Sequence, residues 1–127
     1  MLTVYGLKSC DTTKKALKWL ERRETPHRFL DVRADGVDND RLTEWAMEVG
    51  WEVLINRGSK TWRGLDEVIR ENVTEDIALQ LMAENPTLIK RPVIETEAGV
   101  LVGWKPEQQR TLEELIAEKA PKKGIVE

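Results

Sequence analysis

The pattern over the first 32 residues constrains the fold of this chain more than any other feature. Leu2–Tyr5 is rich in strand formers, Gly6–Ser9 has the composition of a loop, and Asp11–Arg23 carries apolar residues at helical spacing. Pro26 interrupts the chain, and His27–Val32 is typical of a second strand. A strand, a helix and a strand in this order form a right-handed crossover between two parallel strands. The sequence therefore predicts an α/β fold that begins with a β-α-β unit.

The middle of the chain predicts mainly helices. Apolar residues recur at the spacing of an amphipathic helix up to Gly50, which is well placed to end that helix. Trp51–Asn56 indicates another short helix. Thr74 is followed by two acidic residues and is a typical N-cap for the next helix, which Pro86 follows. We expect a helical insertion at about residues 38–85.

The last third predicts a hairpin and a final helix. Pro92–Glu95 and Val100–Gly103 are short strand candidates, and the four residues between them suit a hairpin connection. Apolar residues at Leu112, Leu115 and Ile116 mark the last helix. The whole order, β, α, β, several helices, β, β, α, predicts an α/β sheet with mixed strand directions.

Cysteine and histidine each occur once, as Cys10 and His27. A disulfide within the chain and a zinc site with four cysteine or histidine ligands are therefore excluded, and no metal is expected. A length of 127 residues suits one compact domain with its own core. A net charge of -3 does not indicate direct binding of nucleic acid. With no apolar run long enough to span a bilayer and no charged leader, we expect a cytoplasmic protein without a membrane partner.

Cys10 is the candidate nucleophile, because a serine–histidine system would have to use His27, which lies on a predicted strand. Cys10 directly precedes the first predicted helix, where unpaired amide groups and the helix dipole lower the pKa of a thiol. Six basic and two acidic residues between positions 8 and 23 give this segment a net charge of +4, which leaves -7 for the rest. The alternative is a small buried cysteine beside a solvated lysine face.

Position 13 is threonine, so the sequence lacks the second cysteine of a Cys-x-x-Cys motif. A cycle that passes through a mixed disulfide or an oxidised Cys10 must therefore be completed by an external thiol, such as glutathione or a partner protein. A phosphatase-type loop is also excluded, because it needs an arginine six residues after the cysteine and Ala16 stands there.

Tyr5–Thr12 reads YGLKSCDT and Leu88–Val93 reads LIKRPV. These two segments, with further agreement between them, notably at Asn56–Gly58, resemble the ArsC/Spx superfamily, and within it the YffB-like branch most closely. The resemblance runs from about residue 2 to residue 115. It implies a thioredoxin-like fold in a single domain at residues 1–118 that contains the helical insertion. The tail at 119–127 has little to bury, and we expect it to be frayed.

The resemblance also implies roles for particular residues. In the glutaredoxin-coupled arsenate reductases of the superfamily, the cysteine is the nucleophile and three basic residues hold the oxyanion. Arg57 and Arg91 match two of these by position, and Lys105 falls at the third, where arginine is usual. We expect these three and Lys8 to bind the substrate. The alternative for both arginines is a solvated position or pairing with a carboxylate. The remaining site residues are expected to be structural: Thr13 and Pro92, the latter following a cis peptide bond against the cysteine.

Two departures from the arsenate reductases favour the YffB-like branch. Lys105 keeps the positive charge but loses the bidentate fork that suits a tetrahedral oxyanion, and Gly6 stands where those enzymes have a histidine near the thiol. The implied function is a glutathione-dependent thiol reductase that binds no cofactor and uses glutathione as co-substrate.

Three partners are implied: glutathione, glutaredoxin, and a small anionic or glutathionylated substrate. Two alternatives stay open. One is a glutaredoxin-coupled arsenate reductase. The other, of a different class, is an Spx-type regulator that binds RNA polymerase, although the redox switch of such regulators typically uses the Cys-x-x-Cys motif that Thr13 interrupts.

Overall fold

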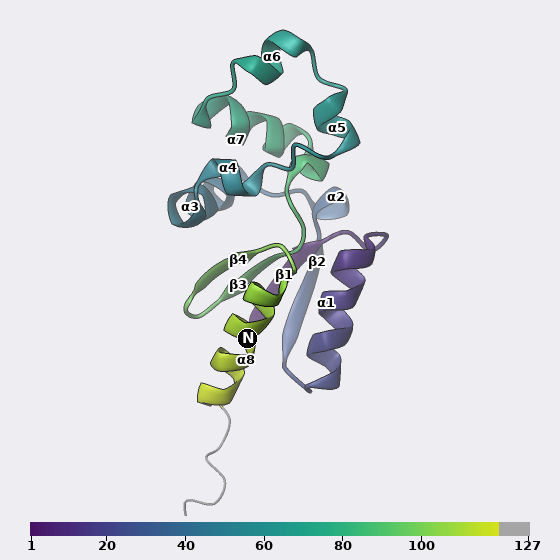
Figure 1. Cartoon of the computed structure of the whole chain (residues 1–127), viewed down its shortest axis with the longest axis vertical. Helices are drawn as coiled ribbons and strands as arrows, with labels where there is room; N and C mark the ends of the chain where they lie inside the picture. Colours follow the sequence, from purple (N-terminus) through teal and green to yellow (C-terminus); the bar gives the residue numbers. More distant parts are fainter. Residues whose placement is uncertain (120–127) are drawn as a thin grey trace, which may run out of the picture.

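The computed structural model describes residues 1–119 and is built on one four-stranded sheet (Figure 1). The strands are β1 (Leu2–Gly6), β2 (His27–Asp31), β3 (Val93–Thr96) and β4 (Gly99–Val102). Their order across the sheet is β2-β1-β3-β4. β1 is parallel to β2 and antiparallel to β3, and β3 and β4 form the predicted hairpin. The α/β class and the mixed strand directions are thereby confirmed.

Two helices pack on one face of the sheet. They are α1 (Asp11–Arg22), which connects β1 to β2, and α8 (Pro106–Lys119), which follows β4 (Figure 1). Side chains alternate along a strand, so every second residue of β1 points to this face. The core that the sheet shares with the two helices is fully buried and consists of Val4, Leu20, Ile94 and Leu112.

A helical segment separates β2 from β3 and lies beyond one end of the sheet (Figure 1). Its elements are α2 (Val32–Asp35), α3 (Asn39–Val49), α4 (Trp51–Leu54), α5 (Lys60–Arg63), α6 (Glu67–Glu71), α7 (Glu75–Glu84) and the 3-10 helix η1 (Pro86–Leu88). Its apolar side chains form a second core with the other face of the sheet, where Tyr5 and Val93 contribute. The segment is thus packed against the same strands that carry the thiol loop.

A polar cluster on β3 helps to hold the helical segment on the sheet. The carboxylate of Glu95 accepts hydrogen bonds from the Tyr5 hydroxyl at 3.0 Å, from the Trp45 indole at 2.9 Å and from Arg41 at 2.6 and 2.8 Å. Burial, the charge of Glu95 and this hydrogen bond raise the pKa of Tyr5 to about 12. Because Arg41 and Trp45 belong to α3, the cluster joins α3 to the centre of the sheet.

The structure differs from the sequence prediction mainly in short elements. β2 ends at Asp31 rather than Val32, because the Asp31 carboxylate accepts hydrogen bonds from the amides of Arg33 and Ala34 and so begins α2 at Val32. Four further elements, none longer than five residues, were not predicted from the sequence: α2, α5, α6 and η1. The predicted end of α3 at Gly50 is confirmed, with a φ of 88° that favours glycine.

Within residues 1–119, no helix combines the length and the apolar character that crossing a membrane requires. The tail that we expect to be frayed lies outside the described residues, except for residue 119, which ends α8.

Candidate functional site

Cys10 lies between the end of β1 and the start of α1. A tight turn joins the two, in which the Cys10 amide donates a hydrogen bond to the Leu7 carbonyl at 3.0 Å. Cys10 is the N-cap residue of α1, and its carbonyl accepts from the Lys14 amide at 3.0 Å. Its side chain is half-buried. The sequence prediction of a thiol at a helix N-terminus is therefore confirmed.

The surroundings of Cys10 favour the thiolate. Burial raises the pKa of the thiol, but hydrogen bonding from the side chain and amide of Thr13, from the Arg91 side chain and from the Thr12 amide outweighs burial, so the pKa lies below its ordinary value. Hydrogen bonds from these donors stabilise the ionised sulfur more than the neutral thiol, which is the usual way in which a protein favours a thiolate.

Thr13 is fully buried on the inner side of α1, and its hydroxyl accepts a hydrogen bond from the Leu7 amide at 3.4 Å. Gly6 packs directly against it. A Cβ atom added at position 6 would lie 2.6 Å from Thr13 Cγ2 and closer still to Thr13 Oγ1. A larger residue at position 6 therefore requires Thr13, or the backbone of β1 or α1, to shift. This contact gives a physical reason for glycine at a position where the sequence analysis noted a departure from histidine.

Arg91 reaches the thiol because β3 pairs with β1, which places the start of β3 beside the end of β1. The Arg91–Pro92 peptide bond is cis, as expected, and Pro92 is buried. Arg91 Nη1 donates to the carbonyls of Thr87 at 2.9 Å and Ile89 at 3.1 Å, which fixes the guanidinium. Its Nε is buried without a hydrogen-bond partner among the described residues.

Arg57 lies in the exposed loop between α4 and α5. Its guanidinium carbon is 6.0 Å from the ring centroid of Trp51 and 5.7 Å from that of Trp62. Residues Ile55 and Ile89 form an isolated antiparallel bridge. This bridge places the chain that leads to Arg57 alongside the chain that leads to Arg91. The structure therefore brings the two predicted arginines to the same end of the molecule, with the Arg57 guanidinium near two tryptophan rings.

The two predicted lysines, Lys8 and Lys105, are exposed, and their side chains are less constrained than those of the two arginines. The Lys8 amide donates to the Asp31 carboxylate at 3.1 Å, and the Lys105 amide donates to the Gln108 side chain at 2.8 Å. Within residues 1–119, no hydrogen bond or salt bridge ties either ammonium group to the thiol.

Asp31 is a site residue that the sequence analysis missed. Its carboxylate accepts from the amide of Lys8 as well as from the start of α2, so it anchors the loop that leads to Cys10. Hydrogen bonds from the amides of Lys8, Ala34 and Arg33, helped by the Lys8 charge, lower the pKa of Asp31 below its usual range despite a small opposing effect of burial. The signal in the sequence was an N-cap aspartate at the end of a strand.

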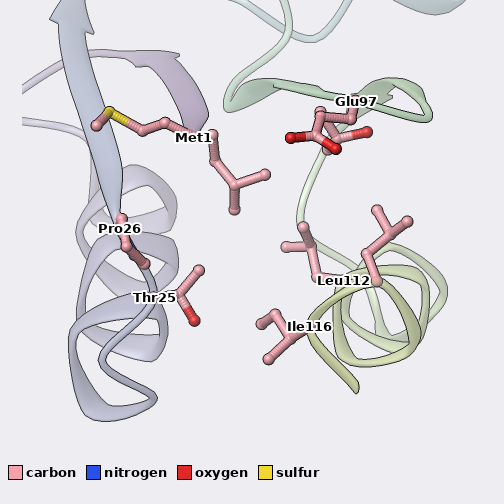
Figure 2. A pocket seen from close by; sticks show the side chains of 9 residues that line it. Met1, Thr25, Pro26, Glu97, Leu112 and Ile116 are labelled. Carbon is pink, nitrogen blue, oxygen red and sulfur yellow. The ribbon is translucent and has the colours of Figure 1, made fainter. Parts of the chain in front are cut away.

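A separate apolar cavity of about 210 Å³ lies at the opposite end of β1 from the thiol loop. Figure 2 shows Met1, Pro26, Leu112 and Ile116 around it. Its lining is almost wholly apolar, so it does not suit an anionic substrate and we do not place the chemistry there. Within the described residues, no cluster of three or more histidine, cysteine, aspartate or glutamate side chains could hold a metal ion.

Comparison with known proteins supports the resemblance found in the sequence. The pattern of the ArsC family matches residues 5–112. A protein of Haemophilus influenzae whose function is uncharacterised is 49% identical over 104 residues, which cover 82% of this chain and 91% of that protein. The global transcriptional regulator Spx of Enterococcus faecalis is 30% identical over 112 residues, 87% of this chain and 84% of the regulator.

Solved structures similar to this chain support the same resemblance. A protein named YFFB is 40% identical with a TM-score of 0.82, over 87% of this chain and 97% of that one. An arsenate reductase (ArsC) related protein from Brucella melitensis is also 40% identical, with a TM-score of 0.72 over 89% of this chain and 94% of its own. The thioredoxin-like fold class and the likeness to the YffB-like branch are confirmed.

Proposed function

The chain belongs to the ArsC family, and on that premise we propose that it is a glutathione-dependent thiol–disulfide reductase with Cys10 as its nucleophile. At the level of the family it is an arsenate reductase-like thiol oxidoreductase. The observation that carries the finer proposal is the lone, half-buried thiol of Cys10, whose pKa is lowered by the hydrogen bonding of Thr13 and Arg91 against the effect of burial.

In the proposed reaction, the Cys10 thiolate attacks the glutathione sulfur of a glutathionylated substrate. The substrate leaves as a thiolate and takes up a proton, and Cys10 is left in a mixed disulfide with glutathione. The thiolate of a free glutathione then attacks the glutathione sulfur of that mixed disulfide. Oxidised glutathione is released and the Cys10 thiolate is restored. The net reaction replaces the disulfide of the substrate by the disulfide of oxidised glutathione, so the chain needs no second cysteine.

A lowered pKa assists both halves of this cycle. It increases the fraction of Cys10 that is ionised at neutral pH, and only the thiolate is a nucleophile. It also makes Cys10 a better leaving group when the second glutathione attacks. The same hydrogen bonds from Thr13 and Arg91 therefore serve the attack and the release.

The basic residues are assigned to the anionic groups of glutathione and of the substrate. Arg91 has a buried Nε with no partner among the described residues, and it lies at the thiol. Arg57 is exposed, and its guanidinium lies 6.0 Å from the ring of Trp51 and 5.7 Å from that of Trp62. Lys8 and Lys105 add positive charge from exposed positions near the ends of their loops.

Two other functions have an observation in their favour. Reduction of arsenate is favoured by the likeness to an arsenate reductase related protein, but Gly6 and Lys105 stand where arsenate reductases have histidine and arginine. A regulator that binds RNA polymerase is favoured by the likeness to Spx. Thr13 argues against a disulfide switch in that role, because its position would have to hold the second cysteine.

The rate of alkylation of Cys10 by iodoacetamide as a function of pH tests the proposal. The chain has one cysteine, so all of the reaction is at Cys10, and a Cys10→Ser variant gives the background. We expect a midpoint below the value of about 8.5 for an ordinary cysteine. A midpoint at or above that value would remove the main support for the mechanism. Capture of RNA polymerase with full function in Cys10→Ser would favour the regulator instead.

A further inference from the structure

The outer side of α1 carries a row of positive charge. Thr13, Ala16 and Leu20 form the buried side of the helix. The opposite side exposes a set of basic residues that we call the α1 basic face: Lys14, Lys15, Lys18 and Arg22. Lys14, Lys18 and Arg22 are each four residues apart, which aligns them along one line of the helix surface. α1 itself lies along one side of the molecule (Figure 1).

Within residues 1–119, the α1 basic face forms no salt bridge, although Asp11 and Glu21 lie three or four residues from its lysines on the same helix. Within residues 1–119, the salt bridges join Arg23 to Glu113 and Arg41 to Glu95, and neither uses this face. Like charges spaced by four residues destabilise a helix by about 0.2–0.5 kcal/mol per pair, and cations near a helix N-terminus are also unfavourable. Arg22 lies in the last turn, where a cation is favourable, so the unfavourable positive charge is that of the lysines, which no salt bridge within residues 1–119 uses.

The position of the α1 basic face next to the thiol indicates a role in binding a partner of Cys10. α1 begins immediately after Cys10, and the Lys14 amide bonds to the Cys10 carbonyl. From Cys10 to Arg22 the chain advances about 18 Å along the helix, longer than the roughly 10 Å that a tripeptide such as glutathione spans, so a ligand that reaches the thiol and covers the whole row is a protein segment. Since residues 8–23 carry a net charge of +4 and the rest of the chain -7, an acidic partner is attracted more strongly to the segment that carries the thiol than to the rest of the chain.

We propose that the α1 basic face docks acidic protein segments and so selects, as substrates, proteins whose glutathionylated cysteine lies among aspartate and glutamate residues. This inference rests on the proposed function, because it assumes that Cys10 removes glutathione from such cysteines. The docked segment lies along α1 while the Cys10 thiolate attacks the glutathione sulfur. The sulfur–sulfur bond to the substrate breaks, and the substrate cysteine departs as a thiolate that takes up a proton.

Two synthetic peptides of equal length serve as probes, each with one cysteine in a disulfide with glutathione. One has glutamate on both sides of the cysteine and the other has lysine. The second-order rate constants are measured by release of the peptide thiol at low ionic strength. We expect the acidic peptide to react about 10-fold faster or more, and the difference to shrink as salt is added. This order opposes intrinsic reactivity, since neighbouring lysines make a thiol the better leaving group.

The variant Lys18→Glu/Arg22→Glu reverses charge on the face at two positions away from the thiol. We expect it to lose the preference for the acidic peptide. Arg28→Glu/Arg110→Glu makes the same change in charge at exposed positions on β2 and α8 and should keep the preference. Equal rates for the two peptides with the wild type, or an unchanged preference in the first variant, would overturn the docking proposal.

The uncharged 2-hydroxyethyl disulfide separates this proposal from the function on which it rests. If the wild type reduces this disulfide with glutathione but does not distinguish the peptides, the docking proposal fails and the proposed function stands. If the wild type reduces neither this disulfide nor either peptide, both fail. The expected result is reduction of all three probes by the wild type, with the acidic peptide ahead of the basic one.

Discussion

The contact between Gly6 and Thr13 makes a stability prediction that needs no assumption about substrate. In Gly6→Ala, the new methyl group would lie 2.6 Å from Thr13 Cγ2 and closer to Thr13 Oγ1, well inside van der Waals contact. Thr13 is fully buried and β-branched, and its hydroxyl accepts the Leu7 amide, so it cannot turn away without losing that bond. Either β1 or α1 must move.

The expected cost follows from the chemistry of the contact. Forcing one extra methyl group into a packed core typically costs about 1–3 kcal/mol. Thr13→Ala alone should cost about 1–3 kcal/mol, because it leaves the buried Leu7 amide without its acceptor. In Gly6→Ala/Thr13→Ala, however, both atoms that collide are gone, and the new methyl group faces the Cβ atom of residue 13 at 3.1 Å. The second substitution should therefore relieve most of the cost of the first.

Urea unfolding of the wild type, both single variants and the double variant gives the coupling free energy. We expect a coupling of about 1–3 kcal/mol in the direction of relief. Gly6→Ala/Thr13→Ser is the matched control, because serine retains the hydroxyl oxygen that collides and should relieve less. If Gly6→Ala costs the same in the wild type as in the Thr13→Ala variant, within about 0.5 kcal/mol, the packing argument is wrong.

Three further predictions concern the site and its support. Arg91→Gln should raise the pKa of Cys10 by removing a charged donor, and each unit of increase slows alkylation at neutral pH about tenfold. Arg57→Gln should raise the KM for a glutathionylated peptide about tenfold with little change in that pKa, which steady-state kinetics would show. Tyr5→Phe should cost about 1 kcal/mol in urea unfolding at pH 7, because Glu95 loses one donor. Since folding raises the pKa of Tyr5 from 10.0 to about 12, this stabilisation is present below pH 10.0 and is lost as the pH rises through about 12.

The elements that the sequence predicts are those with a local signal. The β-α-β unit, the helix that ends at Gly50 and the C-terminal hairpin all depend on periodicity or on turn residues close in sequence. The short helices were missed because one or two turns carry no readable period. Their caps were present in the sequence, however: Asp31 begins α2, and the Ser59 hydroxyl accepts from the Trp62 amide at the start of α5.

The candidate site likewise contains features that the local sequence predicts and features that depend on tertiary packing. Cys10 at a helix N-terminus follows from its place between a strand and a helix, and the roles of Arg57 and Arg91 came from resemblance alone. The contact of Gly6 with Thr13 depends on how α1 packs on β1, and the bonds of Glu95 join residues 50 or more positions apart in sequence to β3. A local sequence pattern does not predict such pairings, because they are determined by tertiary packing.

Intact mass after incubation with oxidised glutathione at neutral pH tests the central claim most directly. The account predicts one adduct of glutathione mass on the wild type, no adduct on Cys10→Ser, and loss of the adduct when reduced glutathione is added. A wild-type protein that stays unmodified, or an adduct that reduced glutathione does not remove, would contradict the proposal that Cys10 works through a mixed disulfide with an external thiol.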